Sequence, residues 1–218
     1  MEERALAAVP GFPPSLAAVG RILLAEGRID EAASRIEGAY RAGLRDAPLL
    51  MARARLLDQR GKMAEAVEAY REALLVAPRS SVLLRDLGAF YSRHGDRQMA
   101  LTFHGRAAEA DPDDPLAARD LTLLLEDMGR ISAALDVARD AARRATGRIE
   151  AQRAGAGWAD SGGGDEKQVI LLAARLEAKA GDRGRADGWL EPLRRLGMLK
   201  DEDLRAAPEI GESANRSR

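Results

Sequence analysis

Four glycines recur along the chain at one fixed spacing, and this spacing constrains the fold more than any other feature. Gly27, Gly61, Gly95 and Gly129 follow one another every 34 residues without a slip. A period of about 20 to 50 residues is typical of repeat architectures, in which one supersecondary unit stacks on the next. The spacing therefore predicts a stack of similar units rather than one irregular core.

The residues on either side of these glycines predict helices. Before Gly95 stand Leu84, Leu87, Gly88 and Tyr91, at steps of three and four that mark one face of a helix. A small residue follows each glycine five positions later, in the series Ala32, Ala66, Ala100 and Ala134. Each unit is thus predicted to be a helix, a glycine turn and a second helix, with small residues that let the two helices approach.

The stretch after Gly61 shows how one unit is expected to close. Gly61 supplies a left-handed backbone conformation for the turn between the helices. Tyr70 is expected to fill the space toward the neighbouring unit. Pro78 ends the second helix, because proline lacks the amide hydrogen that the helix ladder needs.

This pattern resembles the tetratricopeptide repeat, whose signature of 34 residues runs W-x2-L-G-x2-Y, then A-x3-F, then P. The unit around Gly95 matches best, with Leu87-Gly88, Tyr91, Ala100 and Pro112. The resemblance covers about residues 13 to 146. It implies an all-α fold, a right-handed superhelical solenoid of antiparallel helix pairs. In that family the first helices of successive units line a concave groove that holds peptides or partner helices.

The spacing of the glycines also predicts the domain organisation. After Gly129 the next comparable glycine is Gly181, so the period is broken by about 18 extra residues. The predicted segments are an N-terminal segment at 1–12, four units at about 13–46, 47–80, 81–114 and 115–146, a glycine-rich insertion at 147–166, a degenerate fifth unit that serves as a C-terminal cap at 167–200, and a polar tail at 201–218.

Composition limits the classes of function. The net charge of −1 argues against a nucleic-acid partner held by bulk positive charge. The absence of cysteine removes disulfides, thiol catalysis and cysteine-based metal sites. No apolar stretch approaches the roughly 18–20 residues that cross a bilayer, and the prolines near the N-terminus argue against a signal peptide. We therefore expect a cytoplasmic protein, and the arginine, alanine and glycine bias favours a bacterial source.

No motif predicts catalysis, a cofactor or a bound metal. His94 and His104 are the only histidines, and two histidines without cysteine partners do not make a metal site. The glycine run at 161–164 lacks the GK[ST] ending of a nucleotide-binding loop. We expect a protein that is not an enzyme and binds no cofactor. The alternative is an enzyme or regulatory subunit with a site at the 147–164 insertion, where Trp158 either anchors a ligand or pads the neighbouring units.

The residues between the apolar columns of each first helix are expected to face the groove. Arg21 and Arg55 occupy one column, and Arg85 and Arg119 occupy another, which Arg175 would extend. The predicted partner-binding positions are Arg21, Met51, Arg55, Arg85, Asp86, Arg119, Asp120 and Leu123.

Arginine binds carboxylates with two parallel hydrogen bonds, so this groove suits an acidic segment or a free C-terminal carboxylate. The alternative is that the repeated Arg-Asp pairs, 85–86 and 119–120, neutralise each other between units, which would contribute little to stability. The sequence therefore predicts a noncatalytic scaffold for a partner protein, either an assembly adaptor or a substrate-holding chaperone. A homodimer through an uncovered terminal unit is a further alternative.

Overall fold

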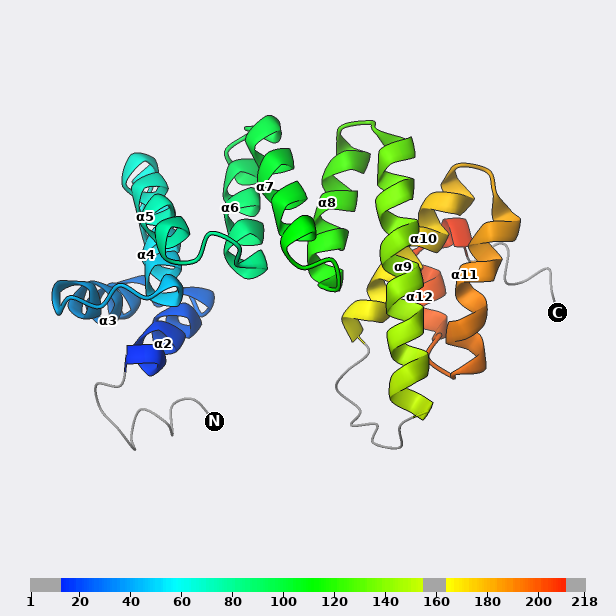
Figure 1. The fold of residues 1–218 in the computed structure, drawn as a ribbon, viewed down its shortest axis with the longest axis horizontal. Coiled ribbons are helices and arrows are strands. Elements are labelled where there is room, and N and C mark those ends of the chain that lie inside the picture. The colour runs from blue at the N-terminus through cyan, green and yellow to red at the C-terminus, as the bar shows by residue number, and fades with distance from the viewer. Residues whose placement is uncertain (1–12, 155–163, 211–218) are drawn as a thin grey trace. The chain divides into compact units, whose positions relative to one another are not determined.

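The computed structural model describes residues 13–154 and 164–210, and within these ranges every regular element is a helix (Figure 1). The helices are α2 (Pro13–Ala25), α3 (Ile29–Arg41), α4 (Ala47–Gln59), α5 (Met63–Val76), α6 (Ser81–Arg93), α7 (Arg97–Ala110), α8 (Pro115–Asp127), α9 (Ile131–Ala154), α10 (Gly164–Lys179), α11 (Arg183–Arg195) and α12 (Asp201–Ala206). The prediction of an all-α fold is confirmed. None of the described helices combines the length and the apolar character that a membrane span needs.

The chain divides into two compact bodies, Met1–His94 and Gly95–Arg218, which we call the N-terminal body and the C-terminal body. Their described helices are α2–α6 and α7–α12. Helices that are consecutive in the chain pack as antiparallel pairs, α2 with α3 and α4 with α5 in the first body, and α8 with α9 and α10 with α11 in the second.

The turns between paired helices depend on the four periodic glycines, as the sequence predicted. Gly61 has φ of 71°, a left-handed conformation that residues with a Cβ rarely adopt. Around it, the amide of Gly61 donates to the carbonyl of Asp58, and the amide of Lys62 donates to that of Leu57, both at 2.9 Å. These bonds satisfy carbonyls that the end of α4 would otherwise leave open. Gly27, Gly95 and Gly129 have φ between 72° and 78°.

Several of the described helices begin at a short polar side chain that caps the first turn. Asp46 accepts a hydrogen bond from the amide of Leu49 at 2.8 Å, and Asp114 accepts one from the amide of Leu116 at 2.9 Å. Each of these caps satisfies an amide that has no partner inside its helix. A proline follows in the first turn of both α4 and α8, where its missing amide hydrogen is harmless.

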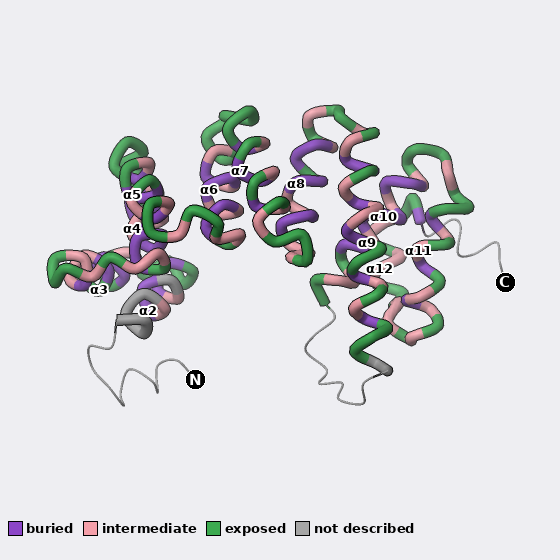
Figure 2. The backbone as a smooth tube through the Cα atoms, viewed as in Figure 1, coloured by how far each residue is buried: buried purple, intermediate pink, exposed green. Residues whose placement is uncertain are grey.

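Close helix packing in the N-terminal body relies on small residues, and Figure 2 shows the buried stripe along each helix. Ala66 and Ala73 on α5 are fully buried. On α2, a Cβ added to Gly20 would lie 2.5 Å from the Cγ1 atom of Ile36, so the glycine is required by the approach of α3. Tyr70 is buried against Phe90 of α6, with 5.4 Å between ring centroids. Its predicted role of filling the space toward the next unit is confirmed.

In the C-terminal body, α9 is longer than the repeat pattern predicts. It continues to Ala154, so the first eight residues of the predicted 147–166 insertion are helical. The apolar stripe of α9 explains this, because Ala142, Ala145 and Ile149 recur at steps of three and four and are buried in one cluster with Val169 of α10. Trp158 and the rest of 155–163 lie outside the described residues.

The predicted polar tail at 201–218 begins with structure. α12 occupies 201–206, and Ile210 beyond it is fully buried against Ala174 of α10 and Leu190 of α11. Hydrophobic burial at Ile210 therefore holds the segment that carries α12 onto the fifth helix pair. Residues 211–218 lie outside the described part of the chain.

Candidate functional site

The predicted groove residues fall on α2, α4 and α6 in the N-terminal body and on α8 in the C-terminal body. The side chain of Arg21 lies outside the described part of α2. Met51 is only 8% exposed, so it packs mainly in the core and presents little surface to a partner. Arg85 lies half-buried on α6. The geometry of Arg55, Asp86, Arg119, Asp120 and Leu123 is more informative.

Arg55 and Asp86 form an ion pair that joins α4 to α6. Arg55 Nε donates to both carboxylate oxygens of Asp86, at 2.9 and 2.8 Å. The hydroxyl of Tyr70 donates to Oδ2 of the same carboxylate at 2.8 Å. Burial and the neighbouring Asp86 charge raise the pKa of Tyr70 well above its usual range, so the hydroxyl keeps its proton. Arg55 therefore neutralises an aspartate of the next first helix, and it takes the place that the alternative interpretation gave to Arg85.

A second polar cluster lies at the turn end of α4 and α6. Asp58 accepts from Arg93 Nη2 at 2.7 Å, and its other oxygen lies 2.6 Å from His94 Nε2. Burial acts to raise the pKa of Asp58, but the hydrogen bonds from Arg93 and His94 outweigh it and lower that pKa. The Asp58 carboxylate is therefore committed to holding α4 against α6.

The C-terminal body contains a pocket of about 230 Å³ on the side where α8 and α10 meet α12. Its walls are Arg119 and Leu123 of α8, Gln168, Leu171, Leu172 and Arg175 of α10, and Asp203, Ala206 and Ala207 at the C-terminal end. Arg119 and Leu123, two of the predicted groove residues, therefore line one pocket. Arg175, which was expected to extend the column of Arg119, lines it with them.

The two arginines of this pocket are held by polar neighbours. Arg119 Nη2 donates to Asp120 at 3.0 Å, and its Nη1 donates to Oε1 of Gln168 at 2.9 Å. Arg175 Nη2 pairs with Glu126, which also accepts from Lys179 at 2.9 Å. The buried Nε of Arg175 has no hydrogen-bond acceptor among the described residues.

Apolar surface lies beside these arginines. Leu123 is 41% exposed and lines the pocket. On the opposite wall, Lys167 and Asp203 form an ion pair at 2.7 Å that fixes α12 against α10. The pocket therefore offers a leucine surface next to two guanidinium groups, a combination that suits an apolar side chain close to a carboxylate.

The wall that α12 supplies was not predicted, because 201–218 was expected to be a polar tail. The sequence nevertheless carried a signal for a helix in this segment. Three acidic residues at 201–203 open the segment, as in the first turn of a helix, and Leu204 and Ile210 follow as apolar positions.

Paired antiparallel helices, left-handed glycine turns and alanine-rich interfaces define a helical-repeat protein. Residues 47–80 match the model of the tetratricopeptide repeat, and the helical-repeat architecture of the chain is that of a tetratricopeptide-repeat protein. Solenoids of this class present extended concave surfaces that bind other proteins.

The comparisons place the chain near several proteins of this fold. It is 32% identical over 75 residues to photosystem I assembly protein Ycf3 of Synechococcus sp. (strain CC9605), which covers 33% of this chain and 43% of that protein. The match thus spans less than half the length of that relative. The fold of this chain resembles that in the crystal structure of MamA, with a TM-score of 0.58 and 15% identity over 86% of this chain and 95% of MamA.

Two further crystal structures share the fold. TTC0263 of Thermus thermophilus, a thermophilic tetratricopeptide protein, superposes with a TM-score of 0.59 and 23% identity over 68% of this chain and 82% of the other. YrrB, described as having an unusual peptide-binding site, superposes with a TM-score of 0.52 and 14% identity over 99% of this chain and 97% of the other.

Proposed function

We propose that the chain is a noncatalytic, cytoplasmic scaffold that binds a segment of a partner protein on the groove face of its first helices. The repeat architecture supports this role, since its concave surfaces serve protein binding. The similarity to a photosystem I assembly protein supports an assembly adaptor, and a substrate-holding chaperone is the related form of the same activity.

The observation that carries the proposal is the pocket between α8, α10 and α12. Leu123 offers an exposed apolar contact, and Arg119 and Arg175 lie beside it. A charge-assisted hydrogen bond contributes roughly 1.5–3 kcal/mol, so a carboxylate that reaches these guanidinium groups gains more than an uncharged group would. The proposed ligand is therefore an acidic segment, or a free C-terminal carboxylate, with an apolar side chain next to it.

The N-terminal body contributes less to this proposal. Arg55 donates to Asp86 through both carboxylate oxygens, so a ligand carboxylate there would first have to displace a fixed aspartate. The pocket with the exposed Leu123 lies in the C-terminal body, so the proposed centre of binding is there, and the predicted contacts through Arg21 and Arg85 are left as secondary positions.

The test is a substitution of Leu123 by aspartate with a matched control on an exposed leucine elsewhere. Leu75 is 86% exposed and lies outside the pocket, so Leu75→Asp introduces the same charge without touching the site. Both variants are expected to keep the wild-type helical circular dichroism, because each replaced side chain is exposed. Partners are captured from a lysate of the source organism with each purified protein and identified by mass spectrometry.

We expect Leu123→Asp to lose partners that the wild-type protein and Leu75→Asp both retain. The segment that binds is then mapped and compared with its C-terminal amide by calorimetry, which separates an end carboxylate from an internal acidic residue. Equal capture by both variants, or equal loss, would contradict the proposed site. Light scattering on the same preparations shows whether the captured partner is a second copy of the chain.

A further inference from the structure

A second pocket in the C-terminal body lies on the other side of α10, between α9 and α11. Its volume is about 350 Å³, and it is lined by Arg139, Arg143, Glu177, Arg185, Gly188 and Trp189. Arg175 and Glu177 are two residues apart on α10, which places them about 200° apart around the helix. The two pockets share no lining residue, so this one is independent of the proposed groove site.

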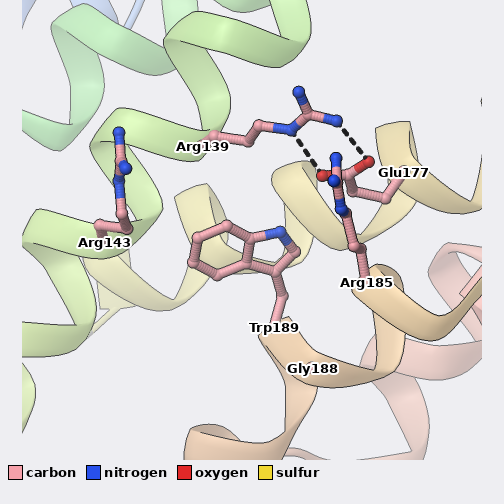
Figure 3. Close-up of a pocket in the computed structure, with 6 residues that line it drawn as sticks. All are labelled: Arg139, Arg143, Glu177, Arg185, Gly188 and Trp189. Carbon is pink, nitrogen blue, oxygen red and sulfur yellow. Dashed lines mark hydrogen bonds and ion pairs between the residues drawn. The ribbon is translucent and has the colours of Figure 1, made fainter. Parts of the chain in front are cut away.

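One arginine of this pocket is committed to the fold. Arg139 donates through Nε to Oε1 of Glu177 at 2.7 Å and through Nη2 to Oε2 at 2.9 Å (Figure 3). Glu177 is only 1% exposed. The hydrogen bonds from Arg139 lower the pKa of Glu177, with a smaller contribution from the indole of Trp189, so this carboxylate stays charged and occupied. The pair forms a wall of the pocket and joins α9 to α10.

The other two arginines have exchangeable partners. Arg143 Nη2 lies 3.2 Å from Asp140, and Arg185 Nε lies 3.3 Å from Asp182. Both pairs are three residues apart on the surface, and the two arginine side chains are 68% and 63% exposed. Such surface pairs contribute little to stability, so either guanidinium can turn to a ligand at small cost.

Trp189 and Gly188 give the pocket its apolar surface and its open space. Figure 3 shows the indole ring of Trp189 between Arg143 on one side and Arg185 with the Arg139–Glu177 pair on the other. Gly188 lies inside α11, yet a Cβ added to it would meet nothing within 4 Å. A glycine inside a helix is unfavourable relative to alanine, and no packing contact explains it here. Gly188 lines the pocket and adds no side chain to the open space there.

We propose that this pocket binds a carboxylate carried on an aromatic or aliphatic body. The body would pack on Trp189, and the carboxylate would accept from Arg143 or from Arg185, which lie on opposite sides of the indole (Figure 3). A monoanion fits better than a phosphate, because Asp136, Asp140 and Asp182 lie close by and repel a second negative charge. The pocket is at the small end of the range for ligand sites, which favours a small body.

Such a group can come from a free organic acid or from the end of a peptide. The first probe is phenylacetate, compared with the neutral phenylacetamide. The second is a short acetylated peptide that ends in phenylalanine, compared with its C-terminal amide. Inorganic phosphate is the control for a charge without an apolar body. All titrations are made at constant ionic strength, since salt screens exposed arginines.

Trp189 reports directly on the pocket. The chain has two tryptophans, so Trp158→Phe leaves Trp189 as the only fluorophore of its kind. In this background we expect phenylacetate or the free-acid peptide to change the fluorescence with saturation. We expect each neutral amide to bind about tenfold more weakly or not at all, which is the usual effect of losing a charge-assisted hydrogen bond.

Three variants test the assignment of the contacts. Arg143→Gln with Arg185→Gln is expected to weaken binding of the acid about tenfold or more, with no effect on the amide. Gly188→Leu is expected to abolish binding of both by filling the space beside the indole. Arg144→Gln is the matched control, because Arg144 also pairs with Asp140 on α9 but does not line the pocket.

The proposal is overturned if no acid gives a saturable signal, if acid and amide bind equally, or if phosphate binds as well as phenylacetate. It is also overturned if Arg144→Gln weakens binding as much as the double variant does. Thermal unfolding of each variant, followed through Trp189, shows whether the C-terminal body is intact. Binding or its absence in this pocket does not test the pocket between α8, α10 and α12, so the two proposals can fail independently.

Discussion

The ion pair between Arg139 and Glu177 makes a sharp prediction about stability. Glu177 is nearly inaccessible to water and accepts two hydrogen bonds from a guanidinium on the neighbouring helix. The substitution Glu177→Gln keeps the shape of the side chain but removes its charge. It leaves Arg139 facing an amide, which can accept only one of the two bonds and brings its own donors toward the guanidinium.

The expected loss in the free energy of unfolding lies between two limits. Hydrogen bonds to charged groups contribute roughly 1.5–3 kcal/mol, whereas breaking a fully buried ion pair costs roughly 3–5 kcal/mol. Arg139 is 31% exposed, so water can solvate part of the guanidinium once the carboxylate is gone. We therefore expect Glu177→Gln to lower the free energy of unfolding of the C-terminal body by about 2 kcal/mol near pH 7.

The pH dependence of this loss follows from the pKa of Glu177. Its value in the folded protein lies below the ordinary 4.5, because Arg139 donates to the charged form. The stabilisation is therefore complete above the unfolded-state pKa and disappears as the pH falls through the lower folded-state pKa. The difference between wild type and Glu177→Gln should be constant near neutral pH and should shrink below about pH 4.5.

Urea unfolding monitored through Trp189 in the Trp158→Phe background measures this quantity for the C-terminal body. Asp140→Asn is the control, because Asp140 belongs to exposed pairs on α9 and should change stability by less than about 1 kcal/mol. The reasoning is refuted if Glu177→Gln unfolds at the same urea concentration as wild type near neutral pH. A difference that stays unchanged well below the ordinary glutamate pKa would also refute it.

Two further predictions concern the N-terminal body and are measured by urea unfolding followed by circular dichroism. Gly61→Ala should destabilise the N-terminal body by about 1 kcal/mol, because φ of Gly61 is 71°. Gly38 lies inside α3, and a Cβ added there would meet nothing within 4 Å, so Gly38→Ala should stabilise the same body by about 0.5–1 kcal/mol. If the two substitutions changed the free energy of unfolding equally, the role given to Gly61 in the turn would be contradicted. Tyr70→Phe should cost about 1–2 kcal/mol, because the hydroxyl donates to Asp86 at 2.8 Å, and an unchanged midpoint would show that this bond adds nothing.

Much of the fold could be predicted because its determinants are local. A glycine at a fixed period predicts a left-handed turn from the backbone preference of one residue, and Gly61 has that conformation. An alanine five positions later predicts a close helix contact, and Ala66 is fully buried. Neither inference needs knowledge of any distant residue.

The candidate site was predictable only in part. The sequence placed Arg175 in the column of Arg119, and these two arginines line one pocket together with Leu123. The partner of Arg55 is Asp86, 31 residues away and not one full period of 34, which the periodicity did not indicate. Met51 was expected to face the groove, but its side chain is buried in the core of the N-terminal body.

The sequence by itself determined the repeat, the two helices of each unit, the glycine turns and the absence of cysteine chemistry, because each follows from residue type and spacing. Only the tertiary structure decided which charges neutralise each other and where open space remains. The length of α9, the return of α12 and Ile210 onto α10, and the space left by Gly188 all depend on how helices from distant parts of the chain pack. Packing is a property of three-dimensional contacts, which periodicity along one helix does not contain.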